Sequence, residues 1–161
     1  KLIFILIHNN SKKIIETISS RCIIYKKRFT FNENLSIASK LTDINLKNCF
    51  NESIINYYFT VGDFLYLYNF SKKNKLNLQQ MSLKSLLIYL INFKNNKNEP
   101  ELINFIYRLI ESYFHYSFLN NKNINLYNFY KYFIKKINYT NKFNLDIESL
   151  FLEFKNKVIN E

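Results

Sequence analysis

The chain has 161 residues, of which 48% are hydrophobic, so it can form the core of one ordinary domain and does not have the composition of a disordered tail. The 23 basic and 12 acidic residues give a formal net charge of +11, which favours an anionic partner, although lysines outnumber arginines 20 to 3, as an AT-rich genome would also produce. The single glycine, Gly62, excludes nucleotide binding by the loops G-x-x-x-x-G-K-[ST] and G-x-G-x-x-G.

The first thirty residues have the pattern of a β-α-β unit. Residues 2–7 are continuously apolar, which is typical of a strand covered on both faces, and the run is too short to cross a bilayer. A short helix that begins at Asn10 or Ser11 and ends near Ser19 leads to a second strand at 22–25. Such a unit needs further strands to complete its sheet, so we expect this chain to be the C-terminal part of a longer protein whose α/β domain is largely missing.

From Asn34 onward the pattern is mainly helical. Residues 35–41, 51–59 and 63–70 are expected to form a small three-helix bundle, with Gly62 as a left-handed turn and Asp63 as the N-cap of the third helix. Residues 71–80 read as a linker. Four longer helices are expected to follow it, at 82–93, from a start at 98–101 to 114, at 126–137 and at 147–158.

The residue types that usually carry chemistry are sparse. Cys22 and Cys49 have no C-x-x-C spacing and no nearby histidine, so a metal site is not expected, and both are predicted to be reduced and buried. His8 and His115 have no partner at metal or triad spacing. The acidic residues form no compact pair. We therefore do not expect the chain to be catalytic alone.

One N-terminal segment is more specific. Residues 4–22 resemble the sensor-1 strand, the following helix and the Ser-Arg-Cys motif of clamp-loader AAA+ subunits, in which an apolar strand and a polar tip precede L-P-x-T-I-x-S-R-C. The residues that match at the family spacing are Thr17, Ile18, Ser20, Arg21 and Cys22. The sequence departs from the motif at Ile15, where the family commonly has proline.

The rest of the chain fits the same family in layout. Residues 144–152 look like the tail of DNA polymerase III subunits of the delta-prime type. The resemblance implies the C-terminal end of an AAA+ ATPase-like domain at 1–29, a three-helix lid at 30–75 and a helical collar for oligomerisation at 76–161. It also implies a cytoplasmic protein without a membrane partner.

The resemblance further implies that the chain is a clamp-loader stator of the delta-prime type, which assists ATP-dependent loading of a sliding clamp onto primed DNA. Arg21 would act in trans as an arginine finger on ATP bound by the neighbouring subunit, so this chain would hold no cofactor itself. Ser20 and Cys22 would be turn and packing residues, and Asn9 would be a vestigial sensor residue. The expected partners are the tau/gamma and delta subunits, the sliding clamp, and primed DNA through the complex.

Three alternatives stay open at this point. Arg21 could be structural and tie a helix end to the sheet by local hydrogen bonds. The chain could instead belong to an ATP-hydrolysing subunit of the tau/gamma type, which an intact phosphate-binding loop upstream would indicate. It could also be a basic helical nucleic-acid-binding module without ring partners, which tight DNA binding with a steep salt dependence would indicate.

Overall fold

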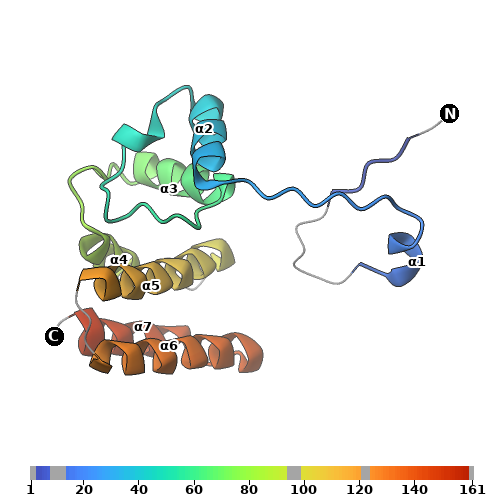
Figure 1. Cartoon of the computed structure of the whole chain (residues 1–161). Coiled ribbons are helices and arrows are strands. Elements are labelled where there is room, and N and C mark those ends of the chain that lie inside the picture. The colour runs from blue at the N-terminus through green and yellow to red at the C-terminus, as the bar shows by residue number, and fades with distance from the viewer. Residues whose placement is uncertain (1–2, 8–13, 94–98, 121–123, 160–161) are drawn as a thin grey trace.

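The computed structural model describes residues 3–7, 14–93, 99–120 and 124–159, and it is mainly helical, as the sequence predicts (Figure 1). Its elements are α1 (Glu16–Ser19), α2 (Phe31–Thr42), a 3₁₀ turn η1 (Leu46–Asn48), α3 (Val61–Lys73), α4 (Leu83–Ile91), α5 (Pro100–Asn120), α6 (Ile124–Phe143), α7 (Ile147–Phe154) and a π-helical turn η3 (Lys155–Ile159). No described residue belongs to a β-strand.

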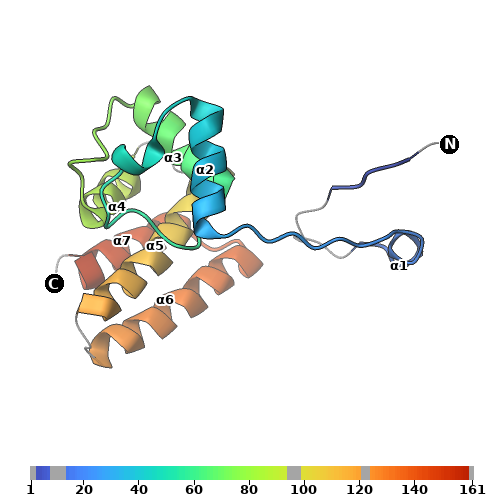
Figure 2. The ribbon, with the colours of Figure 1, turned by 45° about the horizontal axis from the view of Figure 1, so that its top comes forward.

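The expected β-α-β unit does not form in the described part of the first thirty residues. Residues 3–7 and 22–25 make no strand, and the helix between them is the short α1. Ile3, Ile7 and Ile23 are 87%, 95% and 101% exposed, because the segment extends away from the helical body and no described residue covers it (Figures 1 and 2). Two strands without a sheet to join are not stable in water, which accounts for the missing pairing. The predicted helix start at Asn10 or Ser11 lies outside the described residues.

Capping boxes start the two main helices of the region 30–75. Thr30 Oγ1 accepts the N–H of Glu33 at 3.3 Å, and the Glu33 carboxylate accepts the N–H of Thr30 at 2.7 Å. Thr60 and Asp63 make the same reciprocal pair at the start of α3. Asp63 is therefore the third residue of the helix. The prediction that Asp63 is the N-cap is wrong, because Thr60 takes that position.

The left-handed conformation expected at Gly62 occurs elsewhere. Gly62 lies in the first turn of α3 and has no positive φ. The non-glycine residues Asp43, Lys75 and Asn144 have φ of 54°, 54° and 51° just after α2, α3 and α6. Aspartate and asparagine tolerate this region better than most residues. Two of the three left-handed helix ends therefore use aspartate or asparagine in place of the expected glycine.

The predicted helix at 51–59 is replaced by turns. Asn51 Oδ1 accepts the backbone N–H of Ser53 at 3.0 Å, and Asn56 Oδ1 accepts that of Tyr58 at 3.0 Å. Asparagine side chains that bond to the backbone two residues later compete with helical hydrogen bonds. The turns still bury Ile54 and Phe59, which belong to the hydrophobic core although their backbone is not helical.

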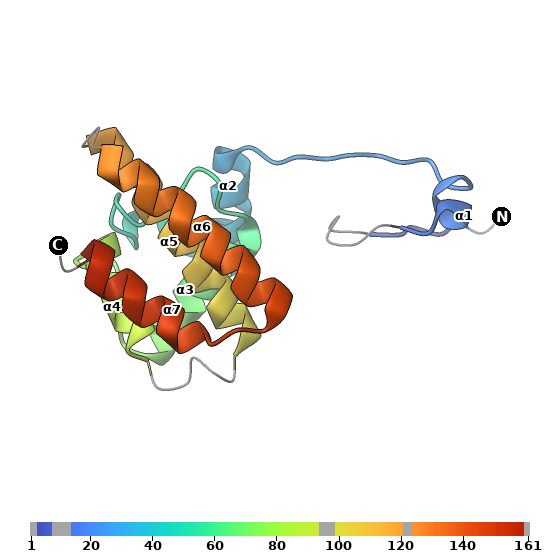
Figure 3. The same ribbon diagram turned by 90° about the horizontal axis from the view of Figure 1, so that it is seen from below.

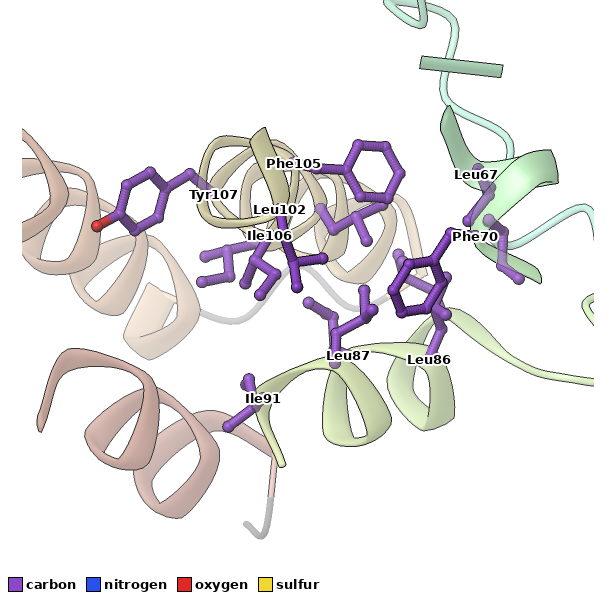
Figure 4. Packing of buried hydrophobic residues seen from close by; sticks show 14 of the residues in the cluster. Leu67, Phe70, Leu86, Leu87, Ile91, Leu102, Phe105, Ile106 and Tyr107 are labelled. Atoms are coloured by element: carbon purple, nitrogen blue, oxygen red, sulfur yellow. The ribbon is translucent and has the colours of Figure 1, made fainter. Parts of the chain in front are cut away.

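The helices α4 and α5 pack against each other beneath α3. Leu86 and Leu87 of α4 point toward the side chains of α3 and α5, including Leu102 and Ile106 (Figure 4). The rings of Phe59 and Phe105 lie 6.2 Å apart, and those of Phe70 and Phe93 lie 5.4 Å apart. The buried core is thus continuous across residue 75, and the division into lid and collar stays a prediction.

The helices α5, α6 and α7 share an aromatic core. Phe114, Phe133 and Phe154 are fully buried, and their ring centroids are 5.3 to 6.2 Å apart. The four predicted longer helices are confirmed by α4 to α7. Helix α6 extends beyond the predicted end at Ile137 to Phe143, because Ile137 and Thr140 continue its buried face and Asn144 then turns the chain.

Candidate functional site

Arg21 lies in the turn that follows α1, on the segment that extends away from the helical body (Figure 3). The backbone N–H of Arg21 donates to the carbonyl of Ile18 at 3.1 Å, and that of Cys22 donates to Ser19 at 3.3 Å. These bonds fix the backbone of the turn while the Arg21 side chain remains exposed. The guanidinium has no hydrogen bond or ion pair with any other described residue. Within the described residues, Arg21 therefore makes none of the side-chain contacts that a purely structural arginine would need.

The neighbours of Arg21 in the motif occupy the same turn. Ser20 Oγ donates to the carbonyl of Thr17 at 3.3 Å, which is a local turn contact. Cys22 is exposed and Cys49 is half-buried, and the two are not joined, so the expectation that both thiols are buried is wrong for Cys22. Cys22 is exposed because residues 22–25 form no strand and no described residue packs over them. Asn9, the expected sensor residue, lies outside the described residues.

Positive charge gathers between Arg21 and α2. Lys26, Lys27 and Arg28 follow the motif, and all three are exposed. Lys27 pairs with Glu33 at 3.2 Å. The pKa of Glu33 is lowered first by the hydrogen bond from the Thr30 backbone and then by Lys27. Within the described segment 14–30, Glu16 is the one acidic residue, so this stretch favours an anionic partner.

A second charged site, which sequence reasoning missed, joins α3 to α5. The Arg108 guanidinium pairs with Asp63 Oδ1, and the other carboxylate oxygen accepts both the N–H and the hydroxyl of Thr60, at 2.9 and 2.8 Å. Asp63 is 3% exposed, and every one of these contacts stabilises its charge. Both carboxylate oxygens are occupied, so Asp63 is suited to holding two helices together and not to proton transfer. The spacing of Thr60 and Asp63, three residues apart at a helix start, is the sequence signal that would have predicted this capping role for Asp63.

A hollow of about 340 Å³ opens beside this ion pair. Tyr58, Glu111 and His115 line it, and the rings of Tyr58 and His115 lie 6.3 Å apart. His115 is exposed, and no hydrogen bond or ion pair joins it to Glu111 or to any other acid or thiol among the described residues. In the part of the chain that the structure describes, no three histidine, cysteine, aspartate or glutamate side chains are grouped as a metal site would require.

Comparison with protein-family models, curated proteins and solved structures finds no significant match to this chain. None of the described helices has the length and apolar character needed to cross a membrane. The motif around Arg21 and the exposure of its guanidinium are therefore the observations from which a function can be argued.

Proposed function

We propose that the chain is part of a clamp-loader stator of the delta-prime type and that Arg21 acts in trans on ATP bound by a neighbouring subunit. The observation that carries the proposal is the exposed Arg21 side chain, which has no partner among the described residues and lies within the T-I-x-S-R-C match. An arginine used to hold its own fold would be expected to pair with a local acid or carbonyl, as Arg108 does with Asp63.

The chemistry of the guanidinium suits this role. It stays charged at all working pH values and offers a planar fork that can contact two phosphate oxygens at once. Charge develops on the γ-phosphoryl group during ATP hydrolysis, and an arginine supplied by a neighbour can stabilise it.

The uncovered apolar residues before α2 support a larger assembly. Ile3, Ile7 and Ile23 are almost fully exposed, although residues of this type are usually buried. We propose that residues 1–29 are the C-terminal end of an AAA+ ATPase-like domain whose other strands lie outside this sequence. The helical body would then supply the lid and the collar that hold the stator in a ring with tau/gamma and delta subunits.

Reconstitution tests the assembly part of the proposal. The longer protein that this proposal implies, mixed with bacterial tau/gamma and delta subunits, should elute with them in one complex on size-exclusion chromatography. Failure to enter the complex would overturn the stator assignment. ATP binding measured on the isolated subunit separates the two clamp-loader alternatives, because a stator should bind none, whereas tight binding would favour the ATP-hydrolysing tau/gamma type.

A further inference from the structure

The exposed face of α6 carries lysines and aromatic rings and has no acidic residue anywhere along the helix. At about 100° per residue, Lys131, Lys135 and Lys142 fall within roughly 40° of one another, in the middle of the face opposite the buried Phe133. They span about 16 Å along the helix axis at 1.5 Å per residue. These lysines therefore form a line of three ammonium groups along the exposed side of α6. Helix α6 lies with α7 in the outermost helical layer (Figure 3).

Aromatic rings alternate with these lysines. Lys131 Nζ lies 4.4 Å from the ring centre of Tyr127, Lys135 Nζ lies 5.5 Å from that of Tyr139, and Lys142 Nζ lies 5.3 Å from that of Phe143. The three aromatic residues are 44% to 58% exposed, so a large part of each ring is available to a partner. We call the set Tyr127, Lys131, Lys135, Tyr139, Lys142 and Phe143 the α6 stripe.

The charge of the stripe is not neutralised within the described residues. Glu153 of α7 does contact α6, but its carboxylate is already bonded to Lys136, Lys157 and Tyr132 and to none of the three lysines of the stripe. No ion pair joins a described acid to Lys131, Lys135 or Lys142. A row of lysines without acids is complementary to a polyanion.

A hollow of about 500 Å³ lies next to the stripe, near the N-terminal end of α6. Asn125, Asn128 and Tyr132 of α6 line it, and Lys157 and Val158 close its other side. Amide side chains can hydrogen-bond to base edges, and aromatic and apolar surfaces accept a stacked ring. Asn128 is on the same exposed face as Lys131 and Lys135, so one ligand could contact both the hollow and the stripe.

We propose that the α6 stripe binds single-stranded nucleic acid, with phosphates along the three lysines and unpaired bases on the exposed rings and in the adjacent hollow. Lysines account for the attraction to phosphate, and the rings account for the preference for a single strand, because bases in a duplex are already stacked on one another. The inference goes beyond the clamp-loader proposal and does not depend on Arg21 or on ring partners.

The direct test is fluorescence anisotropy of a labelled oligothymidylate titrated with the full 161-residue chain at several NaCl concentrations. The unchanged chain should bind the strand, and its affinity should fall steeply with salt. In the triple variant Lys131→Gln, Lys135→Gln, Lys142→Gln, affinity should fall by about tenfold or more, and the salt slope should decrease by about 2, since each phosphate contact contributes about 0.7 on a single strand.

A matched control separates this surface from general charge. The triple variant Lys40→Gln, Lys47→Gln, Lys84→Gln loses the same charge from exposed lysines on α2, η1 and α4. It should bind nearly as well as the unchanged chain. Equal losses in the two triple variants, or no binding of the strand at low salt, would overturn the proposal. Circular dichroism and thermal unfolding establish that all variants are folded.

The role of the rings is tested with the double variant Tyr127→Leu, Tyr139→Leu. Its affinity for oligothymidylate should fall by about tenfold, while its affinity for an abasic strand of the same length should stay near that of the unchanged chain. Tighter binding to a duplex than to the single strand would contradict the proposal. So would binding to vesicles of anionic phospholipid with no binding to DNA, because the stripe would then be a membrane-binding surface.

Discussion

Lys136 of α6 and Glu153 of α7 form an ion pair where these two helices pack together. The same carboxylate accepts a hydrogen bond from the Tyr132 hydroxyl at 2.8 Å and pairs with Lys157 at 2.8 Å. Burial opposes the charge on Glu153, but the hydrogen bonds from Lys136, Lys157 and Tyr132 outweigh it and lower its pKa to about 2. Glu153 thus connects α6, α7 and η3 through one charged group.

Replacing Glu153 should destabilise the end of the helical body. Glu153→Gln removes the charge while keeping the size, and we expect the free energy of unfolding at neutral pH to fall by about 1 to 2 kcal/mol, less than a fully buried pair would give because both lysines are partly exposed. Urea unfolding followed by circular dichroism measures the change. Glu52→Gln, on an exposed turn, is the matched control and should change stability by less than about 0.5 kcal/mol.

Stability should also depend on pH through this residue. The pKa of Glu153 is about 2 in the folded protein against 4.5 for an ordinary glutamate, so the folded state holds the charged form more strongly. Its contribution is complete above pH 4.5 and is lost as the pH falls from 4.5 toward 2. The stability difference between the unchanged chain and Glu153→Gln should therefore shrink over that interval. A difference that stays constant would contradict this assignment.

The pair between buried Asp63 and half-exposed Arg108 gives a larger predicted effect, because Asp63 also belongs to a helix cap. Asp63→Ala removes both the ion pair and one half of the capping box at the start of α3, and we expect a loss of about 2 to 4 kcal/mol in unfolding free energy. Chemical denaturation measures it, with Glu52→Ala as the control for removal of an exposed acid. A loss below about 1 kcal/mol would show that the pair contributes little to holding α3 against α5.

Tyr107 offers a substitution in the opposite direction. Its side chain packs against Phe151 with ring centroids 5.8 Å apart, while its hydroxyl is buried without a hydrogen-bond partner among the described residues. Burial raises the pKa of this hydroxyl, which agrees with a poorly solvated site. Tyr107→Phe should raise the free energy of unfolding by about 0.5 to 1.5 kcal/mol. A clear decrease in melting temperature would indicate that the hydroxyl has a partner.

Helical periodicity predicted the regions that pack regularly. Phe105 and Leu109 recur with the spacing of one buried face, and both lie in the core of α5. The periodic pattern did not predict the ends of helices or the turns at 51–59, because these depend on single hydrogen bonds such as Asn51 Oδ1 to the Ser53 N–H. The capping pair Thr30 and Glu33 was readable from its spacing, and using it would have placed the start of α2 correctly.

The candidate sites were predicted less completely than the helices. The motif drew attention to Arg21, whose exposure could not be read from a single sequence. The apolar run at 2–7 predicted a strand because such runs are usually covered, but a strand forms only where a partner supplies its hydrogen bonds, and the described residues 3–7 form none. The α6 stripe could not be predicted in full, because the predicted helix ended at Ile137 and left Tyr139, Lys142 and Phe143 outside it, whereas α6 continues to Phe143.

The most direct test of the account is ATP hydrolysis by a clamp loader reconstituted with the Arg21→Ala subunit. Clamp-stimulated hydrolysis should fall by about tenfold or more with assembly unchanged, because the transferred phosphoryl group loses its arginine. Arg21→Lys should recover little, since lysine lacks the planar fork. Arg28→Ala, which removes another exposed arginine, should leave the rate unchanged. An unaltered rate with Arg21→Ala in a fully assembled complex would contradict the role assigned to Arg21.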